Sequence, residues 1–311
     1  MSTQESTFGP AADRSWHRFL DVYEPLRPEL YRYCRYLTRS PWDAEDLVQD
    51  TLARAFVTLA GVSEPHENPR AWLFRVASNL WLNRATAARE RLLEPEAAQT
   101  EAEPRATREA AGTLLVLLSP QERAAVVLKD VFDFSAEEIA AALETTLGAV
   151  KAALHRGRGK LRAPEAESTK ALTPQVLDRF CAAFDAGDLD GLTALLLDDA
   201  IVEMPGLMLE HGAAAARAGT FRGTLQGCAE NDEAQGLSGA PRCEVRWHRG
   251  EPILLWWWQN TVRSVLRVEL RGERIARIRN YFHAPELLSE ICGELALPAR
   301  TNGYRPKLGE H

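Results

Sequence analysis

Residues 147–162 read Leu-Gly-Ala-Val-Lys-Ala-Ala-Leu-His-Arg-Gly-Arg-Gly-Lys-Leu-Arg, and this stretch decides how the first half of the chain folds. Its apolar residues recur at helical spacing on one face, and the opposite face is small or basic. It contains no acidic residue, and its cationic residues are Lys151, Arg156, Arg158, Lys160 and Arg162. A short helix with one apolar stripe and one basic face suits the major groove of DNA. The alternative is an ordinary helical hairpin whose basic face is solvated.

A second, shorter helix is predicted directly before this stretch. Ser135 can cap a helix over residues 136–143, and Glu138 lies where it completes a capping box. Residues 144–146, Glu-Thr-Thr, then form a tight turn. Helix, tight turn and second helix make up the helix-turn-helix unit, whose second helix contacts DNA bases.

Two further blocks of sequence lie in the first half of the chain. Residues 119–140 contain Ser-Pro-Gln-Glu-Arg, Val-Val-Leu and Phe-Ser-Ala-Glu-Glu-Ile-Ala, and residues 43–50 read Asp-Ala-Glu-Asp-Leu-Val-Gln-Asp. They resemble regions four and two of the sigma-70 family of RNA polymerase sigma factors. The resemblance implies that region four recognises the minus-thirty-five promoter element and that region two holds the polymerase clamp. Because nothing here resembles the first region or third domain of longer sigma factors, this half resembles the small extracytoplasmic-function (ECF) group.

The helix predicted over residues 42–60 carries the candidate polymerase surface. Its apolar residues form one stripe, and Asp43, Asp46 and Asp50 fall together on the far side. Such a run is usually a solvated acidic face. The resemblance implies a docking surface instead, with the polymerase-binding residues at the matched positions Asp46, Leu47, Gln49 and Asp50.

A third block, residues 68–80, resembles the helix with which the family recognises and melts the minus-ten element. Asn68 can cap this helix, and Pro69 suits its first position. The candidate DNA contacts are Trp72, Arg75, Asn79, Asn83 and Arg84. An aromatic ring can stack on an unpaired base, asparagine can contact a base edge, and arginine can hold a phosphate. The alternative places Trp72 in the core and leaves the asparagines solvated. In the family the preceding loop, here residues 61–67, captures a flipped base, but the sequence identifies no pocket residue there.

The candidate contacts to the minus-thirty-five element lie on the second helix of the helix-turn-helix: Thr146, Lys151, His155, Arg156 and Arg158. Many relatives have a serine and an arginine where this chain has Ala152 and Ala153, and alanine has no side-chain hydrogen-bonding group. Lys151, His155 and Arg156 are therefore expected to carry more of the recognition. Arg156 is expected to face the groove, because it lies opposite the apolar stripe.

The pattern changes after Thr173. A helical segment is followed by strand-like runs, with a hairpin turn at residues 271–273, and this order predicts an α+β fold with a curved sheet. Residues 173–282 resemble the SnoaL-like, nuclear transport factor two-like superfamily in the opening helix, the turn at 185–192 and the final strand ending in Arg-Asn-Tyr-Phe. The resemblance implies a cone-shaped domain with a pocket at its mouth, which some ECF sigma factors carry as an extension.

Members of this superfamily include isomerases, cyclases and binding modules, so an enzyme is an open alternative. The candidate acids and bases are Asp199, Glu203, His211, His248 and His283, and none lies in a motif that indicates catalysis. Trp257 is a candidate lining of a ligand pocket, although three successive strand tryptophans are more often core or interface. We expect no enzymatic activity, no cofactor and no metal. The amphipathic segment 287–295 is expected to pack on the sigma half or on a second subunit.

Length and composition allow more than one domain. The chain has 311 residues, of which 45% are hydrophobic, and a formal net charge of -7. This charge argues against indiscriminate nucleic-acid binding by the whole chain, but not against a local basic patch. The cysteines, at 34, 181, 228, 243 and 292, lack zinc or redox spacing, so reduced thiols in the cytoplasm are predicted. The N-terminus is unlike a signal peptide, and the apolar runs are too short to span a bilayer.

We therefore predict a multidomain chain with two all-α sigma domains and a following α+β, cone-shaped SnoaL-like domain. The expected boundaries are 13–93 for the region two helical bundle, 94–109 for a flexible acidic linker, 110–163 for the region four helix-turn-helix, 164–172 for a second linker, 173–284 for the SnoaL-like domain and 285–311 for a tail.

The predicted function is that of an ECF sigma factor that directs promoter-specific transcription initiation in the cytoplasm. Its expected partners are core RNA polymerase and promoter DNA, with no membrane partner. Its activity is expected to be modulated in cis by the C-terminal domain, through a small-molecule ligand or an intramolecular contact. The alternatives are a SnoaL-like isomerase, cyclase or ligand-sensing domain tethered to a helix-turn-helix regulator, and a ligand-responsive repressor. The acidic docking helix argues against these alternatives, because none of them needs a polymerase clamp site.

Overall fold

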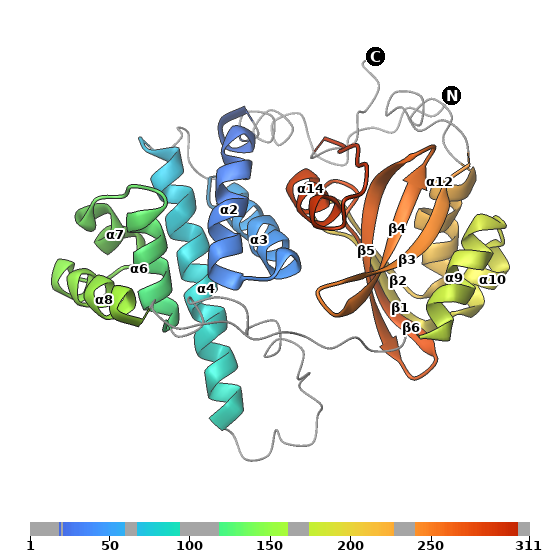
Figure 1. Ribbon diagram of the computed structural model, residues 1–311, viewed down its shortest axis with the longest axis horizontal. Coiled ribbons are helices and arrows are strands. Elements are labelled where there is room, and N and C mark those ends of the chain that lie inside the picture. Colours follow the sequence, from blue (N-terminus) through green and yellow to red (C-terminus); the bar gives the residue numbers. More distant parts are fainter. Residues whose placement is uncertain are drawn as a thin grey trace. The chain divides into compact units, whose positions relative to one another are not determined.

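The computed structural model describes residues 19, 21–59, 67–93, 118–160, 174–226 and 240–303, and the chain divides into two compact units, Met1–Glu167 and Ser168–His311 (Figure 1). The boundary between the units falls inside the predicted linker 164–172. The predicted linker 94–109 and most of the loop 61–67 lie outside the described residues. In the described part of the chain, no helix is both long enough and apolar enough to cross a membrane.

The first helical bundle contains η1 (Glu24–Leu26), α2 (Arg27–Thr38), α3 (Pro41–Leu59) and α4 (Pro69–Leu93). Asn68 caps α4 as predicted, because its Oδ1 accepts a hydrogen bond from the Ala71 amide (3.0 Å). The apolar stripe of α3 is buried, and Ala44 and Val48 have no exposed surface. The predicted amphipathic pattern therefore forms the core of this bundle.

The second helical group contains α6 (Pro120–Asp130), α7 (Ala136–Ala142) and α8 (Leu147–Lys160). Ser135 and Glu138 form the predicted capping box at the start of α7. The chain turns sharply between α7 and α8, where Glu144 has a positive φ of 49°. Gly157 of α8 lies so close to α6 that a Cβ atom there would come within 2.7 Å of Val126. The helix-turn-helix predicted from the sequence is thus present, with α6 supporting its second helix.

The two helical groups are packed together by aromatic rings. Phe132, in the loop after α6, makes edge-to-face contacts with Tyr33 of α2 (5.6 Å between ring centroids) and Phe74 of α4 (5.2 Å). Phe134, just before α7, stacks on the other side of this cluster against Phe74 (5.4 Å). All four rings are buried. The loop between α6 and α7 therefore closes the helix-turn-helix onto α2 and α4.

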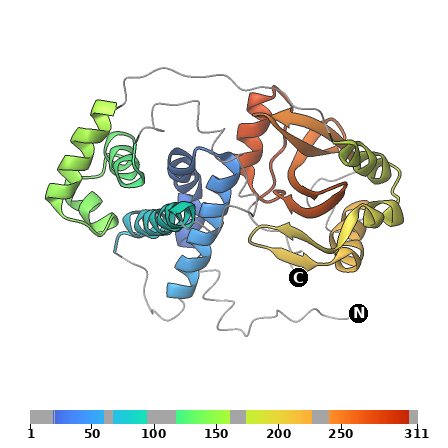
Figure 2. The ribbon, with the colours of Figure 1, turned by 90° about the horizontal axis from the view of Figure 1, so that it is seen from below.

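The second unit is built on a six-stranded sheet in the order β2-β1-β6-β5-β4-β3. Its strands are β1 (Leu196–Met204), β2 (Met208–His211), β3 (Arg242–His248), β4 (Glu251–Trp258), β5 (Thr261–Arg271) and β6 (Arg274–Asn280). β1 pairs with β6 in parallel, and the other neighbouring strands are antiparallel. The predicted α+β class is confirmed, and the helices described next flank this sheet (Figure 2).

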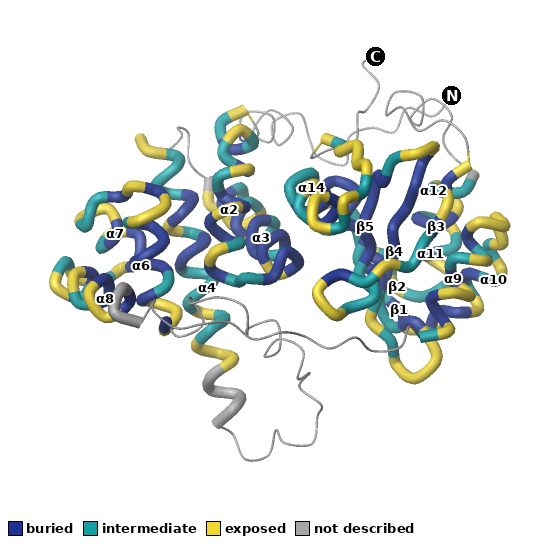
Figure 3. Tube along the Cα trace, viewed as in Figure 1, coloured by how far each residue is buried: buried dark blue, intermediate teal, exposed yellow. Residues whose placement is uncertain are grey.

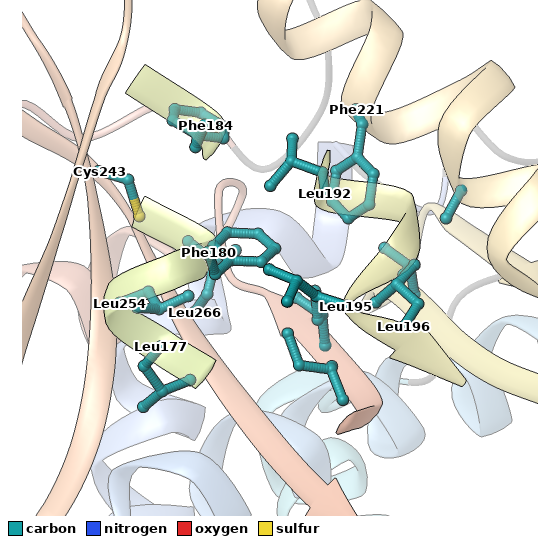
Figure 4. Packing of buried hydrophobic residues seen from close by; sticks show 14 of the residues in the cluster. Leu177, Phe180, Phe184, Leu192, Leu195, Leu196, Phe221, Cys243, Leu254 and Leu266 are labelled. Atoms are coloured by element: carbon teal, nitrogen blue, oxygen red, sulfur yellow. The ribbon is translucent and has the colours of Figure 1, made fainter. Parts of the chain in front are cut away.

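Helices cover both faces of the sheet. On one face lie α9 (Gln175–Asp185), α10 (Leu189–Ala194), α11 (Ala213–Ala216), η5 (Arg217–Phe221) and α12 (Arg222–Gln226), while α14 (Pro285–Glu294) lies on the other (Figure 1). The main apolar core forms between α9 and the strands, where Phe180 and Phe184 lie with Leu254 and Leu266 (Figure 4). Trp256 belongs to the same core and stacks on Phe184. Figure 3 shows that β4 is buried along most of its length, whereas β5 is buried mainly in its first half.

The second unit differs from the sequence expectations in three places. The sequence pattern predicts one short helix over residues 188–197, but α10 ends at Ala194 and Leu196 begins β1. The short strand β2 was not predicted, because four residues are too few to show alternation. The segment expected to be a separate tail contains α14, which packs on β5, and the Val262 amide bonds the Pro298 carbonyl behind it (2.8 Å). The amphipathic face of this segment is therefore part of the domain, with Leu287 and Ile291 fully buried.

Candidate polymerase and promoter surfaces

The acidic face of α3 presents three of the four predicted polymerase-binding residues. The Asp50 side chain is 60% exposed, and Asp46 and Gln49 are partly exposed. Leu47 is completely buried and belongs to the core of the bundle, which differs from its predicted role. The surface that a partner can reach is therefore carried by Asp46, Gln49 and Asp50.

A buried ion pair lies under this face. Arg27 of α2 and Glu45 of α3 form a salt bridge in which both side chains are at least 96% buried. The same Glu45 Oε1 accepts a hydrogen bond from Gln49 Nε2 (2.7 Å), which fixes the direction of the Gln49 side chain. Removing one partner of a buried pair leaves an uncompensated charge, at a cost of about 3–5 kcal/mol. Sequence reasoning missed this support, since Glu45 and Arg27 lie on different helices and in no common motif.

The predicted minus-ten residues lie along α4 as expected. Arg75 and Asn83 are exposed, and Asn79 and Arg84 are partly exposed. Trp72 is half-buried and its ring contacts that of Tyr23 (5.8 Å between centroids, 60° between planes). Trp72 thus combines the two alternatives, since part of its ring supports the bundle and part remains accessible.

Three of these residues are already held by carboxylates of the same unit. Glu144, in the turn of the helix-turn-helix, accepts hydrogen bonds at Oε1 from Arg75 Nη2 and Asn79 Nδ2, both at 2.9 Å. These hydrogen bonds lower the pKa of Glu144 below its usual value, so the carboxylate stays ionised. Arg84 forms an ion pair with Asp50, which joins a predicted minus-ten residue to a predicted polymerase residue. Sequence reasoning treated Glu144 only as a turn residue, because its partners are 65 and 69 positions away.

Two arginines strengthen the contact between the helical groups. Arg70 of α4 binds Glu29 Oε1 (2.6 Å) and the Phe132 carbonyl (3.1 Å) through Nη2, and its guanidinium lies over the Phe134 ring (4.6 Å). Arg123 of α6 donates to the Leu37 carbonyl at the end of α2 (2.6 Å). Burial lowers the pKa of Arg123 to about 10, so it remains charged at neutral pH. The closed arrangement of the unit thus has polar as well as aromatic support.

The exposed face of α8 contains predicted basic residues, and one of them also bonds α6. Thr146 caps the helix, with its Oγ1 accepting from the Ala149 amide (3.2 Å), and Lys151 and His155 are exposed. Arg156 Nε instead donates to Glu122 Oε1 of α6 (2.9 Å), although 59% of its side chain stays exposed. The side chain of Arg158 lies outside the described residues. Lys151 and His155 are therefore two predicted contact residues whose exposed side chains bond no other helix in the contacts described above.

Arg156→Ala is expected to lower the free energy of unfolding of the protein. It is expected to have little effect on which promoter base pairs the protein prefers. Glu122 is 95% buried at its side chain, and loss of a hydrogen bond to such a charged group costs about 1–3 kcal/mol. Denaturant unfolding of the full-length protein measures this loss. Lys151→Ala is the matched variant, because it removes an exposed charge five residues earlier on the same helix and should leave stability unchanged within about 0.5 kcal/mol. If Arg156→Ala leaves the stability unchanged but relaxes the preference at one base pair, then Arg156 contacts a DNA base in the major groove and the stabilising role is wrong.

The candidate groups of the C-terminal domain are spread over its sheet. Asp199 pairs with Arg271 (3.3 Å), and Glu203 pairs with Arg277 (3.6 Å) and with Arg279. His248 Nε2 bonds Glu294 Oε2 (2.7 Å), His283 Nδ1 bonds the Gly303 carbonyl (2.6 Å), and His211 is exposed on the edge strand β2. Burial lowers the pKa of both His248 and His283. The structure does not bring these five groups together, and no metal-binding cluster occurs among the described residues.

Trp257, the predicted pocket residue, is 8% exposed. Its neighbours Trp256 and Trp258 belong to the core that faces α9, whereas Trp257 does not. The guanidinium of Arg242 lies over its ring at 4.9 Å. Alternation along the strand thus places Trp257 on the opposite side from its two neighbours, and Trp257 packs under an arginine.

Comparison with known proteins identifies the first half of the chain. Sigma-70 region 2 matches residues 22–91, and Sigma-70 region 4 matches residues 108–161. The RNA polymerase sigma-E factor of Streptomyces coelicolor is 38% identical over 155 residues, which cover 46% of this chain and 84% of that protein. The chain belongs to the sigma-70 family of RNA polymerase sigma factors. The expected ECF group is supported by the ECF RNA polymerase sigma factor SigG of Mycobacterium tuberculosis, which is 32% identical over 222 residues.

The chain matches only part of the length of some longer sigma factors. The match to SigG covers 58% of this chain and spans 60% of the length of SigG. Among solved structures, the ECF sigma factor SigJ of Mycobacterium tuberculosis is similar over 84% of this chain and 95% of its own, with 21% identity and a TM-score of 0.32.

Proposed function

We propose that this sigma factor directs promoter-specific initiation by core RNA polymerase in the cytoplasm. The single observation that carries the proposal is the pair of neighbouring surfaces on the first bundle. The acidic face of α3, with Asp46 and Asp50, lies outside the core, and α4 carries an aromatic and polar stripe beside it. Acidic side chains offer the polymerase a charged docking surface, while Trp72 and Asn79 offer an unpaired strand stacking and hydrogen bonds.

The helix-turn-helix would contribute the second DNA contact. Lys151 and His155 project from the exposed face of α8, and Thr146 lies at its N-terminus. In helix-turn-helix proteins the N-terminal part of the second helix contacts base edges in the major groove. The minus-thirty-five contact would therefore rest on these three residues, with Arg156 holding α8 to α6.

The closed arrangement of the two helical groups is proposed to be the resting state. A base or a phosphate would need the same donors of Arg75 and Asn79 that Glu144 now occupies. Phe132 and Phe134 must also leave Phe74 if the two groups are to reach promoter elements that lie apart on DNA. Polymerase docking would then supply the free energy that opens the unit.

The C-terminal domain is proposed to modulate this activity in cis without catalysing a reaction. The support for a non-catalytic role is the spacing of its candidate groups, since Asp199, Glu203 and His248 each serve a separate ion pair or hydrogen bond. A general acid or base needs a reacting partner within hydrogen-bonding reach. A small-molecule ligand or a contact with the sigma half would be the modulating event.

Run-off transcription with core polymerase tests both parts of the proposal. Full-length protein and residues 1–165 are both expected to give promoter-dependent transcripts, because the cut lies only two residues before the end of the first compact unit at Glu167. A severalfold difference between them would measure modulation by the C-terminal domain. Absence of transcripts from both proteins, with polymerase binding also absent, would overturn the proposed function. Equal transcription at matched concentration would remove the modulating role alone.

A further inference from the structure

The C-terminal domain brings together two cysteines that are 62 positions apart in the sequence. Cys181 lies on α9 and Cys243 on β3, and their sulfur atoms are 3.1 Å apart. In Figure 4 the Cys243 sulfur lies on the side of the sheet that carries Phe180 and Phe184. The sequence spacing predicted no redox pair, since the two positions are neighbours only in the folded domain.

Two contacts hold α9, which carries Cys181, against β3 and β4 near Cys243. Asp185 at the end of α9 accepts a hydrogen bond from the Cys243 amide (2.6 Å). Phe184 of α9 stacks on Trp256 (4.9 Å between centroids), and Trp256 is the partner of Cys243 across β3 and β4. A disulfide has a sulfur–sulfur distance of about 2.05 Å, so closure requires roughly 1 Å of movement. We expect side-chain rotation to supply most of this movement, because the sulfur atoms are already 3.1 Å apart.

The two thiols differ in their access to solvent. Cys181 is partly exposed, whereas Cys243 is 4% exposed. Burial raises the pKa of the Cys243 thiol well above its usual value, so this thiol stays protonated at neutral pH. A small oxidant from solvent therefore meets the Cys181 sulfur first, and Cys243 lies behind it as the second thiol.

We propose that Cys181 and Cys243 form an oxidation site at which a hydroperoxide closes a reversible disulfide. The Cys181 thiolate attacks one peroxide oxygen, the sulfur–oxygen bond forms, the oxygen–oxygen bond breaks, and the leaving oxygen takes a proton and departs as water or alcohol. Cys243 then attacks the sulfenic sulfur of Cys181. The sulfur–oxygen bond breaks and a second water leaves with the Cys243 proton. Two thiols are oxidised and one peroxide is reduced, and a dithiol reductant reverses the change.

The bond would tie α9, the opening helix of the domain, to β3, which is an edge strand of the sheet. Disulfides restrict the unfolded chain most when they close long loops. The oxidised full-length protein is therefore expected to unfold at a higher temperature in its C-terminal domain, by about 5–15 °C on the usual range for one disulfide. This site does not depend on the proposed role in transcription, and its test contains no transcription step.

Mass spectrometry of the full-length protein after equimolar hydrogen peroxide tests the proposal. The intact mass is expected to fall by about 2 Da, and a non-reducing digest is expected to link the peptides of Cys181 and Cys243. Dithiothreitol should restore the original mass. Cys228→Ser is the matched control and should still lose the 2 Da, because Cys228 plays no part in the bond. Cys34 and Cys292 serve as internal controls, since burial raises the pKa of both thiols, that of Cys292 to about 11.

Two variants test the order of attack. In Cys243→Ser the Cys181 sulfenic acid has no second thiol, so dimedone should label Cys181. In Cys181→Ser dimedone should leave Cys243 unlabelled, because that thiol is buried. Cys243→Ala replaces Cys243→Ser if the serine variant fails to fold, as shown by circular dichroism. A protein that keeps its mass in excess peroxide, or that links a different pair of cysteines, would overturn the proposal. Preferential labelling of Cys243 would overturn the assigned order.

Discussion

Asp50→Arg is expected to abolish co-purification of the full-length protein with core RNA polymerase while the fold stays intact. The Asp50 side chain is 60% exposed on α3, outside the core, so the substitution changes stability little. In a desolvated interface, loss of one charged contact and gain of a repulsion cost about 2–5 kcal/mol. This corresponds to roughly 30-fold to several thousand-fold in affinity. Co-purification with core polymerase, quantified against the wild type, measures the loss.

Arg84→Ala is the matched control for this prediction. It breaks the same Asp50–Arg84 ion pair but leaves the acidic face in place, so polymerase binding should be retained. Thermal unfolding of both variants verifies that the bundle is intact. Normal binding by Asp50→Arg would remove α3 as the docking surface. An equal loss in Arg84→Ala would mean that the ion pair, and not the acidic face, is required.

Phe132→Ala is expected to open the N-terminal unit and to raise its affinity for a single strand carrying the minus-ten element at least tenfold. Phe132 is 4% exposed, and its ring packs on Tyr33 and Phe74 of the first bundle. Truncation of a buried phenylalanine costs about 3–5 kcal/mol, and here the cost falls on the closed arrangement. When the competent state is a minor population, apparent affinity rises in proportion to that population. Fluorescence anisotropy of a labelled oligonucleotide with the full-length protein measures the change.

Val131→Ala is the control for the effect of truncating any side chain in the loop between α6 and α7. Val131 is the residue before Phe132, but its side chain is 37% exposed, so its truncation should leave the closed arrangement unchanged. Glu144→Gln probes the polar contact separately, because it keeps the size of the side chain and removes the charge that holds Arg75 and Asn79. Like Phe132→Ala, the Glu144→Gln variant should bind the oligonucleotide more tightly than the wild type. If Phe132→Ala and Glu144→Gln both bind the oligonucleotide like the wild type, the closed arrangement does not restrain DNA binding.

Several structural features could be predicted from the sequence because they depend on residues that are close together in the chain. The capping box at Ser135 and the cap at Asn68 depend on residues three positions apart. The apolar stripes that bury α3 follow from helical spacing alone. Alternation along β4 separated Trp257 from its two neighbours. In each case the interacting groups lie within one element, so the chain order contains the whole interaction.

Other positions were decided by side chains from distant elements. Arg156 lies on the basic side of its helix in the sequence pattern, yet it bonds Glu122 of α6. Leu47 lies inside the docking motif, yet packing of α3 buries it completely. The segment around Leu287 has an amphipathic face that a pattern cannot assign to a partner, and α14 places it on β5. Spacing along one helix defines a face, but only packing defines what covers it.

The sequence by itself therefore determined most of the elements, the α+β class of the second unit and the sigma-70 character of the first half. These rest on periodicity, caps and motifs within short windows. The tertiary structure alone decided that Glu144 binds Arg75 and Asn79, and that Cys181 lies 3.1 Å from Cys243. Both contacts join residues more than 60 positions apart, and hydrogen-bonding and sulfur contacts act only over a few ångströms. Such contacts exist only once the intervening helices and strands have folded into place.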